Sequence, residues 1–91
     1  MENKKTLIIQ NDLGLHGRAA AKIVELSRKY KSKLFFKKNG YGEVDGSNIL
    51  SILTLSGSKG TEIEAKASGE DSMDLLEELG RLFDNKFGEG R

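Results

Sequence analysis

The sequence contains no cysteine, no proline and no tryptophan among its 91 residues, and it has a single histidine. Without cysteine, neither a disulfide framework nor a thiolate metal site is available. One histidine also makes a structural zinc site a poor hypothesis, because such sites need four cysteine or histidine ligands. We therefore predict neither a bound metal nor a cofactor.

Excess charge and long apolar runs are also missing. Fifteen Lys and Arg residues against 14 Asp and Glu residues give a formal net charge of +1, which is not the basic surplus of a nucleic-acid-binding domain. No apolar run approaches the length of a membrane span, and the start of the chain does not resemble a signal peptide. We expect one cytoplasmic domain over residues 1–91, with no nucleic-acid partner and no membrane insertion.

Strand and helix patterns alternate along the chain. Alternating apolar residues predict strands at 6–10, 33–38 and 61–67, and apolar residues spaced by three or four predict helices at 17–30 and from about 71 to 87. Asn39-Gly40 is a strong hairpin signal and predicts a further strand at 41–44. The run 49–55 fits either a buried strand or a short helix, and the capping residues at 45–48 favour the helix.

Together these elements follow the order β-α-β-β-α-β-α, which indicates an α+β fold with a mostly antiparallel sheet and helices on one face. Leu7 and Ile9 would then face the helices, whereas Ile8 and Phe35 would point to the open face. These two are either ordinary exposed residues or a partner or dimer contact. Ser68 and Asp71 have capping-box spacing before the last helix, and we expect residues 88–91 to be frayed.

The sole histidine, His16, lies between Gly14 and Gly17, where the first strand pattern gives way to the first helix pattern. A helix start offers unsatisfied backbone N–H groups and the positive end of the helix dipole. Arg18 adds a planar, permanently charged guanidinium suited to phosphate oxygens. A neutral imidazole is a competent phosphoryl acceptor near neutral pH. A lone histidine is most often structural or simply exposed, but this setting favours a phosphoryl or anion site.

Two other kinds of site fit the sequence poorly. No serine near His16 is placed for activation, Asp12 has no set spacing to it, and a domain this small rarely has the cleft of a hydrolase. The patterns Gly40-Tyr41-Gly42 and Gly88-Glu89-Gly90 do not open a helix after a strand, as a dinucleotide fingerprint requires. We therefore interpret both patterns as turns.

The segment Asn11-x-x-Gly14-Leu15-His16-Gly17-Arg18-x-Ala20 resembles the active-site signature of the HPr-type phosphocarriers of phosphoenolpyruvate-dependent phosphotransferase systems. The resemblance continues in one register through the hairpin at 39–40, the run 47–55, the segments 58–60 and 63–69 and the last helix. The ending Leu82-Phe83-x-x-x-Phe87 is more similar to the nitrogen-related branch, NPr, than to the sugar branch. The resemblance implies an open-faced β-sandwich, a four-stranded antiparallel sheet with three helices on one side.

The resemblance also implies a role for each residue of the site. His16 would accept a phosphoryl group on Nδ1 from phosphorylated enzyme I and pass it to an enzyme II protein, such as an enzyme IIA. Arg18 would steady the phosphate, and the backbone N–H groups of Gly17 and Arg18 would hold its oxygens. The chain would then be a phosphoryl carrier that forms a transient phosphohistidine, and not an enzyme.

A docking surface for both partners is implied at the short helix, where Ile49, Leu50 and Leu53 match the family's contact positions. Core packing is the alternative for these three, and we expect Leu50 to be the most exposed. The alternative function is a regulatory module on the same scaffold that docks to a kinase or a transcription factor. Intact His16 and Arg18 favour the carrier.

Three departures from the family pattern bear on the site. Ala19 stands where the family has proline, and Gly17 stands where alanine is common, so we expect a less rigid site and slower transfer without loss of function. Asn48 occupies the position of a serine that a regulatory kinase phosphorylates in one branch. We predict no such regulation at Asn48; a register slip that exposes Ser47 is the less favoured alternative, and intact mass after kinase treatment tests it.

Overall fold

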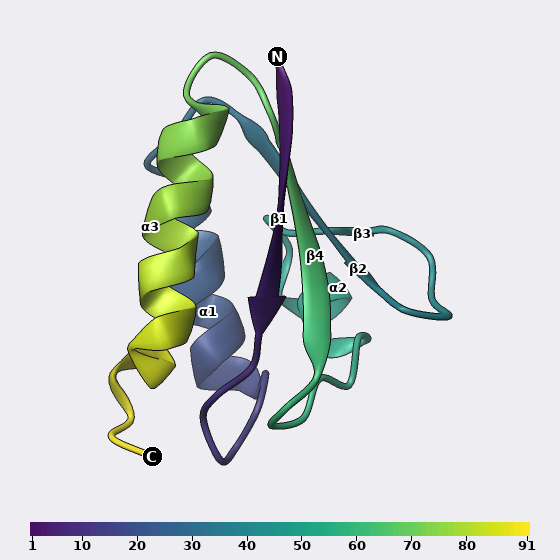
Figure 1. The fold of residues 1–91 in the computed structure, drawn as a ribbon, viewed down its shortest axis with the longest axis vertical. Helices are drawn as coiled ribbons and strands as arrows, with labels where there is room; N and C mark the ends of the chain where they lie inside the picture. Colours follow the sequence, from purple (N-terminus) through teal and green to yellow (C-terminus); the bar gives the residue numbers. More distant parts are fainter.

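The computed structural model describes residues 1–91 and consists of a four-stranded antiparallel sheet with helices packed against one face (Figure 1). The elements are β1 (Glu2–Ile8), α1 (Gly17–Ser27), β2 (Lys33–Lys38), β3 (Val44–Asp45), α2 (Ile49–Leu53), β4 (Glu62–Ser68), α3 (Ser72–Asp84) and the 3₁₀ turn η1 (Lys86–Gly88). The sheet order is β1-β4-β2-β3. This confirms the predicted α+β open-faced sandwich, including the short helix α2. None of the helices has the length and apolar content needed to cross a membrane.

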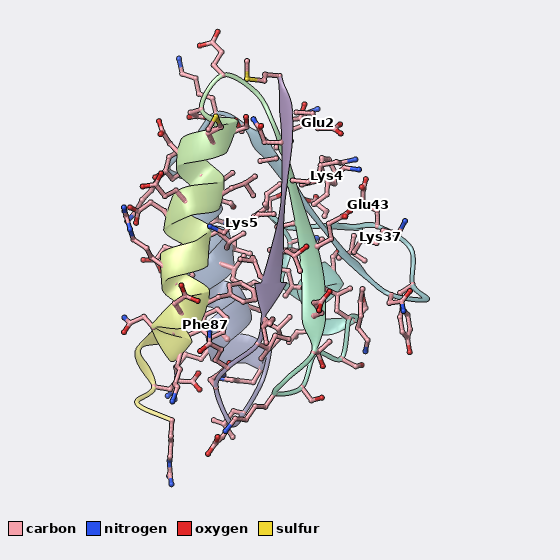
Figure 2. The ribbon with its side chains drawn as sticks, in the orientation of Figure 1. Glu2, Lys4, Lys5, Lys37, Glu43 and Phe87 are labelled. Atoms are coloured by element: carbon pink, nitrogen blue, oxygen red, sulfur yellow. The ribbon has the colours of Figure 1, made fainter.

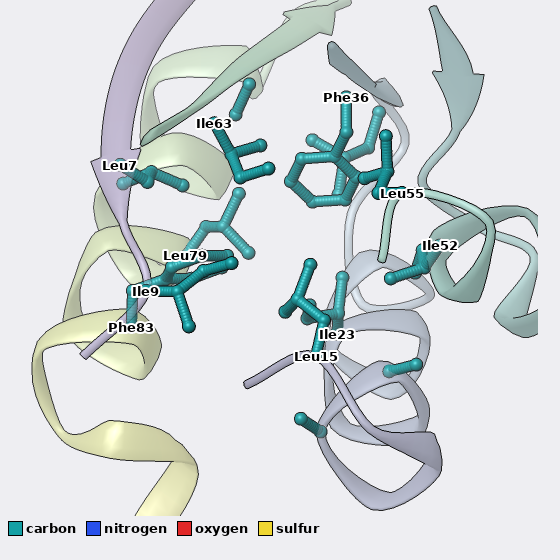
Figure 3. Close-up of a cluster of buried hydrophobic side chains, with 14 of the residues drawn as sticks. Leu7, Ile9, Leu15, Ile23, Phe36, Ile52, Leu55, Ile63, Leu79 and Phe83 are labelled. Carbon is teal, nitrogen blue, oxygen red and sulfur yellow. The ribbon is translucent and has the colours of Figure 1, made fainter. Parts of the chain in front are cut away.

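The core lies between the sheet and the helices (Figure 3). Leu7 and Ile9, which were predicted to face the helices, are both buried. The alternating apolar residues of β2 and β4 are buried as well: Leu34, Phe36, Ile63, Ala65 and Ala67. On the open face, Ile8 is 50% exposed, but the Lys66 ammonium lies 5.2 Å from the Phe35 ring centroid and partly covers that ring. Strand β4 separates Ile8 from Phe35, so the two side chains do not form one apolar patch.

The hairpin after β2 differs from its prediction. A turn forms at Asn39-Gly40, where the Tyr41 N–H donates to the Lys38 carbonyl at 2.9 Å and Gly40 has a φ of +86°. Strand pairing resumes only at Val44, which pairs with Phe36. This pairing is shifted by one residue from the register that a tight two-residue hairpin at Asn39-Gly40 would give. The predicted third strand is therefore present, but its bounds of 41–44 are wrong: β3 is confined to Val44–Asp45.

Strand β1 begins earlier than predicted, because its backbone pairs with β4 from Ile8 opposite Glu62 to Glu2 opposite Ser68. Its first half is polar and carries no apolar alternation. Asn3 donates to the Ser72 hydroxyl at 2.8 Å. Lys5 lies against α3 at Gly80, where an added Cβ would be 2.8 Å from the Lys5 ammonium (Figure 2). These inward polar residues explain why periodicity underestimates the strand.

Asp71 holds the α1–β2 connection at the start of α3. Its carboxylate accepts hydrogen bonds from the Ser32 hydroxyl and from the backbone N–H groups of Lys31 and Ser32, both at 2.9 Å. It makes no side-chain cap bond, so the predicted capping box with Ser68 is wrong. The hydrogen bonds from Ser32 and Lys31 hold the pKa of Asp71 below its ordinary value.

We predict that Asp71→Asn destabilises the protein near neutral pH and that this difference shrinks in acid. The pKa of Asp71 is lower in the folded state, so its ionised carboxylate stabilises the fold above the unfolded pKa. That contribution is lost as the pH falls through the folded pKa. Thermal melts of both proteins near neutral pH and in acid test this, with exposed Glu70→Gln as the control. The same loss in melting temperature at both pH values would contradict it.

Candidate functional site

His16 is the N-cap residue of α1, with an extended backbone at φ −82° and ψ 178°. Its Nδ1 atom accepts a hydrogen bond from the Arg18 backbone N–H at 3.3 Å. Its carbonyl accepts the first helical bond, from the Ala20 N–H at 2.9 Å. The imidazole side chain is 26% exposed. The structure therefore brings His16 together with Gly17 and Arg18, the first two residues of the helix, and Nδ1 faces the helix start.

The loop before His16 is fixed by Gly14. This residue has a φ of +68°, and a Cβ added to it would lie 2.3 Å from the Gly57 carbonyl oxygen. The same carbonyl accepts a hydrogen bond from the Leu15 N–H at 2.9 Å. Only glycine combines this backbone conformation with so close an approach. The contact joins the histidine loop to the α2–β4 connection.

Several donors at the start of α1 are open to an anion. The backbone N–H groups of Gly17 and Ala19 have no acceptor within the chain, and that of Arg18 is bound only to His16 Nδ1. The guanidinium of Arg18 is exposed and makes no ion pair. A hollow of about 520 Å³ lies beside it, lined by Asp12, Leu13, Arg18, Lys22, Gly88, Glu89 and Arg91. Free N–H groups at a helix start and an unpaired guanidinium suit a phosphate.

The C-terminal residues 85–89 turn back onto the histidine loop. Helix α3 ends at Asp84, and Lys86, Phe87 and Gly88 all have positive φ angles, of +54°, +56° and +76°. Phe87 lies at the end of α3 (Figure 2), buried with its ring centroid 5.0 Å from that of Phe83. Its carbonyl accepts a hydrogen bond from the Lys22 ammonium. The predicted helix to 87 is therefore wrong beyond Asp84, although Phe87 is part of the core.

Glu89 reaches the histidine from this segment. One carboxylate oxygen accepts a hydrogen bond from the Asn11 amide at 2.9 Å, and the other pairs with His16 Nε2. Asn11 is fully buried and also donates to the Gly14 carbonyl at 2.8 Å. The prediction that residues 88–91 are frayed is therefore wrong for Glu89, whose side chain is only 10% exposed. Burial raises the pKa of Glu89, but the hydrogen bonds from His16 and Asn11 outweigh it, so this pKa lies below its ordinary value.

The predicted docking residues of α2 differ in exposure. Leu50 is 74% exposed, Ile49 is exposed to a lesser degree, and Leu53 packs partly against the core. Core packing thus explains the partial burial of Leu53, but it buries little of the Leu50 side chain. Leu13, in the histidine loop, is a further exposed apolar residue that was not predicted.

The start of α2 is capped by Asn48, whose side-chain oxygen accepts a hydrogen bond from the Ser51 N–H at 3.1 Å. Ser47 donates to the Asp45 carboxylate through its hydroxyl at 2.6 Å and its N–H at 2.8 Å. These two bonds hold the pKa of Asp45 below its ordinary value.

The structure contains no metal-binding cluster: nowhere in the molecule are three His, Cys, Asp or Glu side chains grouped closely enough to hold a metal ion.

Comparisons with known proteins agree with this geometry. The family model described as the PTS HPr component phosphorylation site matches residues 3–85. Phosphocarrier protein HPr of Xylella fastidiosa is 39% identical over 83 residues, which cover 91% of this chain and 92% of that protein. Phosphocarrier protein NPr of Escherichia coli is 30% identical and covers 98% of this chain and 99% of its own.

Solved structures give the same result. The crystal structure of HPr-C-His from Thermoanaerobacter tengcongensis has a TM-score of 0.89 and 32% sequence identity, covering 96% of this chain and 97% of its own. A phosphocarrier protein HPr from Bacillus anthracis has a TM-score of 0.84 at 26% identity, covering 90% and 96%. The family match spans nearly the whole chain and includes the histidine at the helix start. The chain belongs to the HPr family, which includes NPr, the phosphocarrier proteins of the phosphotransferase system.

Proposed function

We propose that this chain carries a phosphoryl group on His16 Nδ1, received from phosphorylated enzyme I and passed to an enzyme IIA-type protein in the cytoplasm. The observation that carries the proposal is the direction of Nδ1, which points at the Arg18 N–H among the unpaired donors of the helix start. A phosphoryl group on this atom would meet those donors without any rearrangement of the helix. Membership of the HPr family supports the same assignment.

The transfer itself is a nucleophilic displacement at phosphorus. The Nδ1 lone pair forms the new bond to phosphorus while the bond to the donor breaks, and the donor atom keeps that electron pair. The Gly17 and Arg18 N–H groups and the Arg18 guanidinium bind the phosphoryl oxygens. The next acceptor takes the group by the same displacement, which regenerates His16. The chain is thus a carrier in a relay and not an enzyme with a substrate of its own, and this chemistry needs neither metal nor cofactor.

Docking is assigned to Ile49, Leu50 and Leu53 of α2, with Leu50 as the main contact because it is the most exposed. Helix α2 contacts α1, whose first residues hold the phosphoryl site, so one partner surface can cover both. Apolar side chains that are exposed in a free monomer are the ones a partner can bury.

Serine regulation receives no support from the local geometry. Asn48 fills the cap of α2 and has no hydroxyl group to phosphorylate. The Ser47 hydroxyl is bound to the Asp45 carboxylate, whose charge would repel a phosphate. We therefore propose a carrier without a regulatory serine kinase as partner, in preference to the regulatory module.

Incubation with phosphoenolpyruvate and enzyme I tests the proposal. Intact mass should show one added phosphoryl group that is labile in acid and stable in alkali, as phosphohistidine is. A second incubation with an enzyme IIA protein should remove it. No added phosphate under conditions that phosphorylate a standard HPr would overturn the proposal.

We also predict that Ala19→Pro stabilises the protein by about 0.4–1 kcal/mol and speeds phosphoryl transfer. The Ala19 N–H has no acceptor in the chain and is not one of the groups that we assign to the phosphoryl oxygens. Proline therefore removes no hydrogen bond and fixes the first helical turn. Ala20→Pro is the matched control, because it breaks the 2.9 Å bond from the Ala20 N–H to the His16 carbonyl. Denaturant melts and uptake rates measure both variants. Equal destabilisation by the two prolines would show that the first-turn argument is wrong.

A further inference from the structure

Glu89 contacts His16 at Nε2, whereas the Arg18 backbone N–H contacts Nδ1, so phosphoryl binding at Nδ1 does not explain the Glu89 contact. We propose that Glu89 is a positioning residue that keeps the proton of His16 on Nε2 and balances the charge that the ring gains when Nδ1 is phosphorylated. This inference rests on the proposed function.

The segment that carries Glu89 is held in place at several points. Phe87 is buried against Phe83, and the Phe87 carbonyl accepts a hydrogen bond from Lys22 of α1. Beyond this anchor the Glu89 carboxylate is oriented by Asn11, a buried residue of the histidine loop. Both oxygens of Glu89 are used, one by Asn11 and one by His16. A carboxylate held in this way from two sides has a fixed direction toward the imidazole.

The partners of the two ring nitrogens determine the proton position. An ionised carboxylate can only accept hydrogen bonds, so Nε2 must be the protonated nitrogen that donates to Glu89. The Arg18 N–H can only donate, so Nδ1 must carry the free lone pair. The two contacts select the same tautomer. Its free nitrogen is the one that faces the open donors of the helix start.

Phosphorylation makes the role of Glu89 electrostatic as well. When Nδ1 bonds to phosphorus and the donor leaves with its electron pair, the ring gains a positive charge while the proton stays on Nε2. The Glu89 carboxylate is the hydrogen-bond partner of that Nε2–H and is shielded from water, being only 10% exposed. A charge-assisted hydrogen bond at this position strengthens as the ring becomes cationic.

The test combines kinetics with the ring proton signal. Glu89→Gln keeps the size of the side chain and removes its charge; Asp84→Asn, which loses a carboxylate bound only to Gln10, is the matched control. The measured quantities are the kcat and KM of enzyme I with this chain as its phosphoryl acceptor. Glu89→Gln should lower kcat roughly tenfold at unchanged KM, the effect of losing one charge-assisted hydrogen bond. Asp84→Asn should change neither, and Leu50→Ser should raise KM alone.

Proton NMR of the unphosphorylated, ¹⁵N-histidine-labelled protein gives the second readout. A ring proton bonded to Nε2 should be visible in the wild type and in Asp84→Asn, and lost by exchange with water in Glu89→Ala. A ring proton on Nδ1, or an unchanged or increased kcat in Glu89→Gln, would overturn the inference. This signal needs no phosphorylation. If the wild type takes up no phosphate, the proposed function is wrong. The NMR signal still shows which ring nitrogen of His16 carries the proton.

Discussion

Replacing His16 with alanine is expected to abolish phosphoryl uptake, the largest effect of any single substitution in this protein. His16 is the only histidine, and the chain has no cysteine that could accept the group instead. The remaining donors of the helix start could bind phosphoryl oxygens but cannot form a bond to phosphorus. Intact mass after incubation with phosphoenolpyruvate and enzyme I should therefore show no acid-labile phosphate above background.

The His16→Ala variant should remain folded, because its side chain is partly exposed and contributes little to the core. Loss of the N-cap hydrogen bond costs about 1 kcal/mol. Arg18→Lys, which keeps the charge but lacks the planar guanidinium, should be phosphorylated more slowly and serves as the comparison. Phosphate retained by His16→Ala would place the acceptor elsewhere in the chain.

Replacing Phe87 with alanine is expected to affect both stability and the site. The side chain is almost fully buried against Phe83, so its removal should lower the free energy of unfolding by about 3–5 kcal/mol. It also anchors the segment that carries Glu89. The variant should therefore show the lowered kcat of Glu89→Gln, measured well below its melting temperature.

Phe36→Ala is the control for this prediction. Phe36 is equally buried but belongs to β2, away from the C-terminal segment. Its substitution should lower stability by a comparable amount without changing kcat in the folded protein. If Phe87→Ala and Phe36→Ala lower kcat equally, the kinetic effect reflects general loosening of the fold, and the anchoring role of Phe87 is wrong.

The residues that predicted the fold correctly are those whose burial follows a local period. Ile63, Ala65 and Ala67 alternate in β4, and the capping side chain of Asn48 distinguished a short helix from a strand in the apolar run that follows. His16 at the start of α1 was found in the same way, from its neighbours in the sequence. Local patterns report local structure.

The features that the sequence did not predict depend on contacts between distant segments. The polar first half of β1 is a strand because β4 pairs with it, and Asn3 and Lys5 occupy inward positions that no apolar period marks. Glu89 lies 73 residues from His16, after a turn of three positive φ angles. No periodicity connects them. Phe87, apolar and beyond the end of the helix, was the one signal that this segment is packed.

Identifying the nitrogen that carries the phosphoryl group is the most direct test of the proposed function of His16. Phosphorylated protein labelled with ¹⁵N-histidine can be examined by ³¹P and ¹⁵N NMR, in which one-bond coupling identifies the nitrogen bonded to phosphorus. The Arg18 N–H contacts Nδ1, and the Glu89 carboxylate contacts Nε2. We therefore predict coupling to Nδ1 and a proton on Nε2. Coupling to Nε2, or no phosphohistidine at all, would contradict the account.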